Sequence, residues 1–286
     1  MPCRSGWHGV LGGVGVRPSK NGRVNDSMLP PPLALLTKLE AVARQAGALI
    51  LQVYATAFDV GHKADASPVT EADERAESCI TAALIGIDPG IPVVAEEAAS
   101  RGQAPAAGRR FWLVDPLDGT REFVARNGEF TVNIALIEDG VPVLGVVYAP
   151  VPDDMYLGAA GQGAWLVSRG LRSAMACRAV QGHSAVLACS RSHGDEAALQ
   201  HWLQQLQPLL KISARRAVGS SLKFGLLAAG VADVYPRFGP TMEWDTAAGH
   251  AVLRAAGGEV EGLDGLPLRY GKPGYHNPHF VAWGAR

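Results

Sequence analysis

Two long β-rich runs, 131–138 and 141–149, are separated only by Asp139-Gly140. An Asp-Gly dipeptide between two apolar runs is a strong hairpin signal, because both central residues of the tight turn need positive φ. The apolar run 111–114 precedes this pair and predicts a further buried strand. These features require an antiparallel sheet in the first half of the chain.

The remaining periodic segments predict alternating helices and strands. We expect helices over 33–55, from Thr70 onward, and over 195–206, 222–229 and 246–256, with strands at 155–157, 164–167, 185–189 and 233–235. Segment 101–108 is a predicted loop, and Gly257-Gly258 is a natural helix stop. The first half therefore indicates an α+β arrangement, and the second half an α/β arrangement.

Composition excludes several classes of protein. The chain has 286 residues, 48% hydrophobic and 19% charged, with a formal net charge of -1. This balance predicts a substantial core and gives no electrostatic signature for nucleic-acid binding. No apolar run reaches the roughly 18 residues of a membrane-spanning helix. The four cysteines, Cys3, Cys79, Cys177 and Cys189, form no CxxC motif. We expect Cys79 and Cys189 to be reduced core thiols, as in a cytoplasmic protein.

The segment Asp115-Pro116-Leu117-Asp118-Gly119-Thr120 follows the 111–114 run. Two carboxylates and the Leu117 carbonyl can point to one spot, and hard oxygens are the ligands that Mg²⁺ takes. Gly119 allows close backbone approach to a ligand, and a helix beginning at about Thr120 would present free N–H groups to a phosphate. The alternative interpretation is an ordinary Asp-Gly turn.

Other carboxylates also lie at predicted element ends. Glu96-Glu97 follows the apolar run 91–95, Asp245 precedes an Ala-rich helical pattern, and Asp73 lies three residues after Thr70. Carboxylates from separate segments can converge on metal ions. Each also has a structural alternative: Asp73 as half of a capping box with Thr70, Asp245 as a helix N-cap, and Glu97 as a solvated acid.

Taken together, these segments resemble the lithium-sensitive, Mg²⁺-dependent phosphatase superfamily that includes inositol monophosphatase and fructose bisphosphatase. The resemblance covers the chain from about residue 33 to its end. Segments 115–150 and 219–253 are similar to the bacterial 3'(2'),5'-bisphosphate nucleotidases, which remove the 3'-phosphate from 3'-phosphoadenosine 5'-phosphate.

The resemblance implies a layered α-β-α-β-α sugar-phosphatase-like fold, with an antiparallel sheet in the first half and a second, mixed sheet in the second half. We divide the chain accordingly into an α+β metal-binding half, 33–172, and an α/β substrate-binding half, 173–286. Residues 1–32 fall outside the resemblance and are interpreted as a disordered tail or a start-site artefact, with Met28 as the true start.

The resemblance also implies two or three Mg²⁺ ions. Glu96, Asp115 and the Leu117 carbonyl would hold the first ion, and Asp115, Asp118 and Asp245 the second. Some relatives add a third, weaker ion near Glu96. Two such ions can neutralise phosphate charge, activate a water and stabilise the leaving oxygen.

Catalytic and substrate-binding roles follow from the same matches. Thr120, backed by Asp73, would orient the attacking water, with Glu96 in a supporting catalytic role. Substrate contacts are expected from Glu96, from segment 115–120 and from the second half of the chain. The residues are Glu96, Leu117, Asp118, Gly119, Thr120, His193, Ser220, Lys223, Arg237 and Asp245. Lys223 and Arg237 would hold the phosphate that is not cleaved, and their alternative is surface solvation.

The implied function is a hydrolase of 3'-phosphoadenosine 5'-phosphate, linked to sulfur metabolism and inhibited by Li⁺. The first alternative is inositol monophosphatase, whose members usually carry an acid near the Arg237 position and Asn in place of Arg121-Glu122. A catalytically silent ligand-binding regulator is the second. We expect a monomer or homodimer with no nucleic-acid partner and no integral membrane segment. The expected location is the cytoplasm, with a peripheral place at the inner face of the cell membrane as an option.

Overall fold

The computed structural model describes residues 32–62, 68–180, 183–191, 194–207 and 209–285. The expected tail, 1–32, therefore lies almost wholly outside the described residues. Within them, none of the helices combines the length and the apolar character needed to cross a membrane.

The larger sheet has seven strands in the order β3-β4-β5-β6-β7-β8-β9. Their bounds are β3 Val93–Ala95, β4 Arg110–Asp118, β5 Thr131–Glu138, β6 Val141–Ala149, β7 Asp154–Ala159, β8 Gly163–Ser168 and β9 Leu171–Met175. Every pair is antiparallel except β3 with β4, which is parallel. The first sheet is therefore mixed at one edge, where the sequence predicted a purely antiparallel one.

The second sheet has five strands in the order β11-β10-β12-β14-β13 and is mixed, as predicted. Its strands are β10 Ser184–Cys189, β11 Lys211–Ala217, β12 Val234–Arg237, β13 Glu259–Gly262 and β14 Phe280–Trp283. A short two-stranded ribbon pairs β1 Gly61–His62 with β2 Pro68–Val69.

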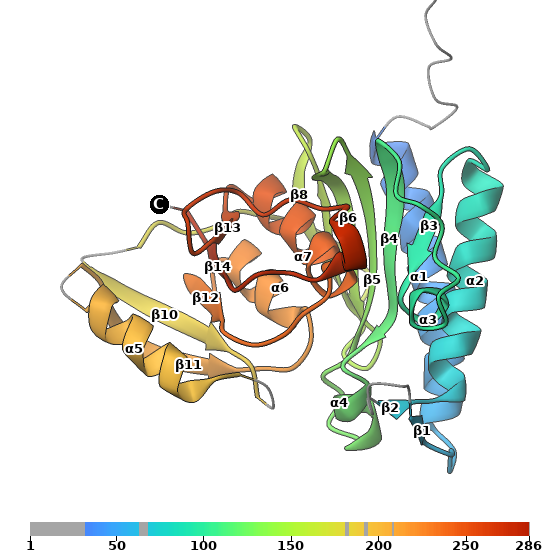
Figure 1. Cartoon of the computed structure of the whole chain (residues 1–286), viewed down its shortest axis with the longest axis horizontal. Coiled ribbons are helices and arrows are strands. Elements are labelled where there is room, and N and C mark those ends of the chain that lie inside the picture. The colour runs from blue at the N-terminus through green and yellow to red at the C-terminus, as the bar shows by residue number, and fades with distance from the viewer. Residues whose placement is uncertain (1–31, 63–67, 181–182, 192–193, 208, 286) are drawn as a thin grey trace, which may run out of the picture.

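Seven α-helices lie in the described part of the chain: α1 Pro32–Tyr54, α2 Glu71–Ile87, α3 Glu96–Ser100, α4 Thr120–Val124, α5 Glu196–Leu206, α6 Leu222–Ala228 and α7 Glu243–Ala255. Helices α1 and α2 pack on one face of the large sheet, and α7 packs on the other (Figure 1). Helix α6 lies between α7 and the second sheet, and α5 packs on the outer face of that sheet. The predicted α-β-α-β-α layering is confirmed.

Helix α7 approaches the large sheet at backbone distance. A Cβ atom on Gly145 of β6 would lie 2.3 Å from the Ala248 carbonyl oxygen, and one on Gly158 of β7 would lie 2.6 Å from Val252 Cα. Real Cβ contacts do not occur at such distances, so only glycine permits this packing. The helix that carries Asp245 is thereby held directly against the strands.

The hairpin, the first helix and the stop at Gly257 follow the prediction. Asp139 and Gly140 have φ of 49° and 74°, as a tight hairpin turn requires. The predicted strands and helices of the second half also occur, but β9, β11, β13 and β14 were not predicted. Of these, β9 and β11 are largely exposed edge strands whose polar residues break the period-two pattern.

One prediction about cysteines is wrong. Cys79, Cys177 and Cys189 are free thiols, and each is only partly buried. Cys79 and Cys189 therefore do not belong to the core. The apolar residues next to them in sequence, Ile80 and Ala188, are the ones that are fully buried. Cys3 lies outside the described residues.

Candidate active site

A bulge in β4 brings Asp115 and Asp118 together. Successive side chains alternate between the faces of a strand, so residues three apart would normally point to opposite sides. Here Asp115 pairs with Asn133 and Asp118 with Thr131, so β4 contains one extra residue. Pro116, which has no N–H to donate, lies in this irregular stretch. Asp115 Oδ1 accepts a bond from the Leu117 amide at 3.0 Å, which orients the carboxylate.

The sequence predicted that the strand would end near Asp115, but β4 continues to Asp118. The pairing of Asp118 with Thr131 on β5 extends it. Segment 115–120, the proposed metal-binding loop, is therefore a bulged strand end and not an isolated Asp-Gly turn. The helix expected at Thr120 begins there as α4, after Gly119 at φ 92°.

Helix α7 places Asp245 beside these carboxylates. The helix begins at Glu243, earlier than predicted, so Asp245 is its third residue and not its N-cap. Asp245 Oδ2 accepts the Met242 amide at 2.9 Å, which satisfies a free N–H at the start of the helix. Ser221 Oγ lies 2.8 Å from Asp118 Oδ2 and 2.7 Å from the Asp245 carbonyl oxygen. Asn133 Nδ2 donates to the same hydroxyl at 2.9 Å.

Glu96 belongs to a third element of the site, the β3–α3 junction. Strand β3 runs parallel to β4 and ends at Ala95, so α3 starts with Glu96 and Glu97 at the same end of the sheet as the carboxyl end of β4. Glu77 of α2 fixes this start, because its carboxylate accepts the amides of Glu97 at 2.7 Å and Ala98 at 2.9 Å. Glu97 itself is 1% exposed, so its interpretation as a solvated acid is wrong.

The electrostatics of this group favour a cation. Burial and then repulsion from Glu96, Asp118 and Asp245 raise the pKa of Asp115 well above its usual value. Burial and the charges of Asp118 and Glu96 do the same to the pKa of Asp245. Within the described part of the chain, no three His, Cys, Asp or Glu side chains stand as a finished ligand set. A bound cation would have to draw these oxygens together. The donor set of hard oxygens fits Mg²⁺.

Asp73 divides its carboxylate between two neighbours. Oδ2 accepts the Thr70 amide at 2.8 Å and the Thr70 hydroxyl at 2.7 Å, which forms the predicted capping box. Oδ1 lies 3.2 Å from the Thr120 hydroxyl, which also lies 3.3 Å from the Leu117 carbonyl oxygen. The capping interpretation is confirmed, and the contact that a catalytic pair would need is present beside it.

A cavity of about 400 Å³ opens over this group. Glu96, Asp118, Thr120 and Asp245 line one part of it, and Ser220, Arg237, Trp244 and His276 are among its other lining residues. Carboxylates and a guanidinium thus share one cavity, and with a cation bound at the carboxylates a ligand with two anionic groups would fit this distribution of charge.

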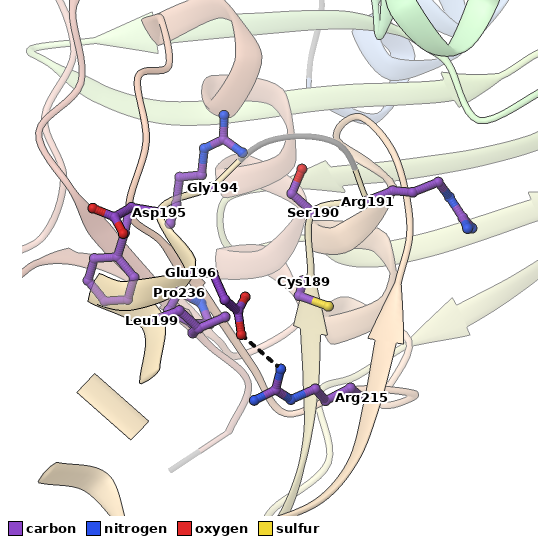
Figure 2. Close-up of a pocket in the computed structure, with 11 residues that line it drawn as sticks. Cys189, Ser190, Arg191, Gly194, Asp195, Glu196, Leu199, Arg215 and Pro236 are labelled. Atoms are coloured by element: carbon purple, nitrogen blue, oxygen red, sulfur yellow. Dashed lines mark hydrogen bonds and ion pairs between the residues drawn. The ribbon is translucent and has the colours of Figure 1, made fainter. Parts of the chain in front are cut away.

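A second cavity, of about 240 Å³, adjoins the first and shares Ser190 and Arg237 with it. Figure 2 shows Cys189, Ser190 and Arg191 at the end of β10, with Arg215 and Glu196 joined as an ion pair at 3.4 Å. The Arg191 side chain extends away from this group in Figure 2. The two cavities thus lie side by side, with Ser190 and Arg237 lining both.

The cations expected on the substrate side are buried. Arg237 is 8% exposed and donates to the Pro240 carbonyl at 3.0 Å. Lys223 is 4% exposed, and its ammonium bonds the carbonyls of Val218 and Ser220. Burial lowers the pKa of Lys223 to about 8. Surface solvation is therefore wrong for both residues. Lys223 lies behind Ser220, which lines the large cavity, and His193 lies outside the described residues.

Sequence reasoning missed Glu77, Asn133 and Ser221. Glu77 could have been found, because it stands four residues after Asp73 and so shares its helix face. Ser221 follows Ser220 in a segment that was singled out, but its position between two carboxylates depends on packing that no local pattern records.

The chain matches the inositol monophosphatase family over residues 33–284. It is 49% identical to the 3'(2'),5'-bisphosphate nucleotidase CysQ of Escherichia coli O157:H7, over 86% of this chain and 98% of that protein. The crystal structure of CysQ from Bacteroides thetaiotaomicron, described as a bacterial member of the inositol monophosphatase family, superposes with a TM-score of 0.73 at 39% identity, covering 88% and 98% of the two chains. An inositol monophosphatase from Anabaena gives a TM-score of 0.69 at 25% identity, covering 88% and 91%. With its carboxylate-lined cavity and its layered fold, the chain belongs to the inositol monophosphatase family.

Proposed function

We propose that this enzyme is a phosphoric monoester hydrolase that removes the 3'-phosphate from 3'-phosphoadenosine 5'-phosphate, giving AMP and phosphate. The observation that carries the proposal is the large cavity, in which Asp118 and Asp245 face the same space as the buried Arg237. A substrate with one phosphate to cleave and a second to hold fits this arrangement. The similarity to the CysQ nucleotidases supports the same substrate class.

The residues present fit two or three Mg²⁺ ions, which when bound would neutralise phosphate charge and lower the pKa of a coordinated water. Glu96, Asp115 and the Leu117 carbonyl would hold one ion, and Asp115, Asp118 and Asp245 another. Asp115 would therefore serve both ions. The Ser221 hydroxyl contacts both the Asp118 carboxylate and the Asp245 backbone carbonyl, so it holds these two proposed ligands next to each other.

Thr120 and Asp73 would position the attacking water. Because the Thr120 hydroxyl donates toward Asp73 Oδ1, its oxygen keeps lone pairs directed elsewhere, and these would accept a hydrogen bond from the water. Asp73 cannot turn away, since its other oxygen caps α2. The amides of Gly119 and Thr120 would bind oxygens of the cleaved phosphate.

Arg237 would hold the 5'-phosphate. Lys223 contributes positive charge from behind Ser220 and fixes the carbonyls around that residue. The inositol monophosphatase alternative fits less well, because an inositol monophosphate would place neutral hydroxyls, and no second phosphate, beside this guanidinium.

The deciding experiment measures kcat/KM on 3'-phosphoadenosine 5'-phosphate, 3'-adenosine monophosphate and inositol 1-phosphate. A charge-assisted contact contributes about 1.5–3 kcal/mol, so Arg237→Ala should cost about tenfold to a hundredfold on the bisphosphate and much less on the 3'-monophosphate. Arg172→Ala, which removes a surface partner of Glu40, is the matched control. Preference of the wild type for inositol 1-phosphate, or equal losses on both adenosine substrates, would contradict the proposal.

A further inference from the structure

One carboxylate ties the metal-binding loop to the substrate side of the cavity. Glu129 lies between α4 and β5, and it accepts two bonds from Arg191, from Nε at 2.9 Å and from Nη2 at 2.6 Å. It also accepts the Gly219 amide at 2.8 Å. Arg191 in turn donates to the Ala217 carbonyl at 3.1 Å. Glu129 and Arg191, here called the latch, thus join the ends of β10 and β11 to the loop before β5.

The backbone around the latch is packed as tightly as its side chains. A Cβ atom on Gly219 would lie 2.7 Å from the Glu129 carbonyl oxygen. One on Gly119, in the metal-binding loop, would lie 3.2 Å from the same oxygen and 3.3 Å from Ser220 Cβ. The Glu129 backbone therefore lies between the two loops that meet at the cavity.

The segments held by the latch are those that line the cavities. Ser190 precedes Arg191 and lines both cavities, and Ser220 follows Gly219 and lines the large one. Ser220 also has a φ of 44°, a backbone state that a serine rarely adopts without external support. A small shift at Gly219 would therefore be transmitted to the surface that a nucleotide must contact.

The outer part of the second sheet is loosely packed. Strand β10 pairs with β12 at a single register position, Leu187 with Val234. Every residue of α5 is described and none is buried, and β11 is exposed along nearly its whole length. At the cavity end, the polar contacts of Arg191 add a connection to the loop before β5, beside the bond from the Asp195 amide to the Phe238 carbonyl. The guanidinium lowers the pKa of Glu129, so the pair stays charged at neutral pH.

We propose that Glu129 and Arg191 are positioning residues that set substrate affinity by holding Ser190 and the Gly219-Ser220 segment against the metal-binding loop. This inference rests on the proposed function, because it assigns the nucleotide moiety of the substrate to that surface. The latch touches neither the reacting phosphate nor the carboxylate set, so it should act on binding much more than on turnover.

The test measures four quantities in Glu129→Gln and Arg191→Gln: KM for 3'-phosphoadenosine 5'-phosphate, the inhibition constant of AMP, kcat, and the Mg²⁺ concentration for half activation. Misplacing a binding surface by about an ångström can cost up to a hundredfold, so we expect KM and the AMP constant to rise about tenfold together. We expect kcat and the Mg²⁺ requirement to change by less than about twofold, since the pair holds binding segments.

Two further variants control for general damage. Arg191→Lys keeps the positive charge but loses the planar guanidinium that donates two hydrogen bonds to Glu129. Its KM should therefore lie between those of the wild type and Arg191→Gln. Asp139→Asn removes the carboxylate partner of Arg109, a bidentate pair at 2.7 Å and 2.8 Å on the hairpin turn, and should leave all four quantities unchanged.

Unchanged KM and AMP inhibition in both latch variants would overturn the inference, as would a loss confined to kcat and the Mg²⁺ requirement. If Glu129→Gln does not fold, Arg191→Gln decides alone, because it leaves the Glu129 bond to Gly219 in place. Failure of the proposed function is distinguishable, since it would appear as absent bisphosphate hydrolysis in the wild type.

Discussion

The seven-stranded sheet and the β10–α5–β11 unit differ sharply in how they are held. Helix α1 alone has nine buried residues, packed against the large sheet and α2, and β5 is buried at every position but its last. In the β10–α5–β11 unit, Leu187 and the partly buried Trp202 belong to a small cluster, and Ala188 of β10 reaches the larger core around α7, but α5 has no buried residue. The buried sheet supplies Asp115 and Asp118, and the peripheral unit supplies Ser190 and Arg191. Under the proposed function, chemistry would rest on the dense part of the molecule and recognition in part on the looser unit.

The largest expected effect tests the dense side. Asp115→Asn removes the carboxylate proposed to serve both ions, so activity should fall by about a hundredfold to a thousandfold, as on the loss of a principal electrostatic group. The measurement is phosphate release across a Mg²⁺ titration. Asp264→Asn, at an exposed position in a turn, is the control. Full turnover by Asp115→Asn, or by the wild type in excess chelator, would break the assignment.

The second prediction compares one glycine from each region. Gly145→Ala places a methyl group against the backbone of α7, and overpacking of this kind costs about 1–3 kcal/mol of unfolding free energy. Gly194→Ala, beside α5, meets nothing within 4 Å and should change stability by less than about 0.5 kcal/mol. Urea unfolding of both variants makes the comparison. Equal losses would show that the two regions are packed alike.

The smallest effect concerns pH. His250 on α7 is buried, with its ring nitrogens 2.9 Å from the Tyr270 hydroxyl and 2.5 Å from Glu259 Oε1. Burial lowers the pKa of His250 below its ordinary value of 6.5, although Glu259 opposes the shift. The contribution of neutral His250 to the free energy of unfolding is then present above pH 6.5. It is lost as pH falls below 6.5, because the unfolded chain binds the proton first.

One such group changes stability by at most about 1.4 kcal/mol per pH unit. Urea unfolding at pH 7.5, 6.5 and 5.5, with chelator present throughout, compares the wild type with His250→Gln. The difference in unfolding free energy between the two proteins should shrink as pH falls, because only the wild type loses the His250 contribution. His201→Gln, on the peripheral helix α5, serves as the control and should keep the wild-type slope. Parallel profiles for the wild type and His250→Gln would contradict the prediction.

Local patterns in the sequence were sufficient for most elements of the dense region, although not for its exposed edge strand β9. The hairpin around Asp139-Gly140 and the helix α1 are each specified by residues close together in the chain. The carboxylates of the candidate site were found for the same reason, since each stands at the end of a periodic run. Burial of Lys223 and Arg237 was not found, because charged side chains give no periodic signal of their own.

The bulge in β4 and the latch between Glu129 and Arg191 lay beyond sequence reasoning for a different reason. A bulge is defined by pairing with another strand, and Asp118 extends β4 only because Thr131 faces it. The latch joins residues 62 positions apart, and neither has a local pattern that marks it. Contacts of this kind arise from topology, which single-sequence patterns do not encode.

Asp73 has a consequence for how diverged relatives should be interpreted. One of its oxygens caps α2 and the other meets Thr120, so selection for a folded helix would preserve the acid even in a lineage that had abandoned hydrolysis. An acid at this position is therefore weak evidence that a relative is a working enzyme. Thr120 is more diagnostic, since its hydroxyl contacts lie within the site itself. A relative that keeps the acid but has lost the threonine hydroxyl would be a candidate pseudoenzyme.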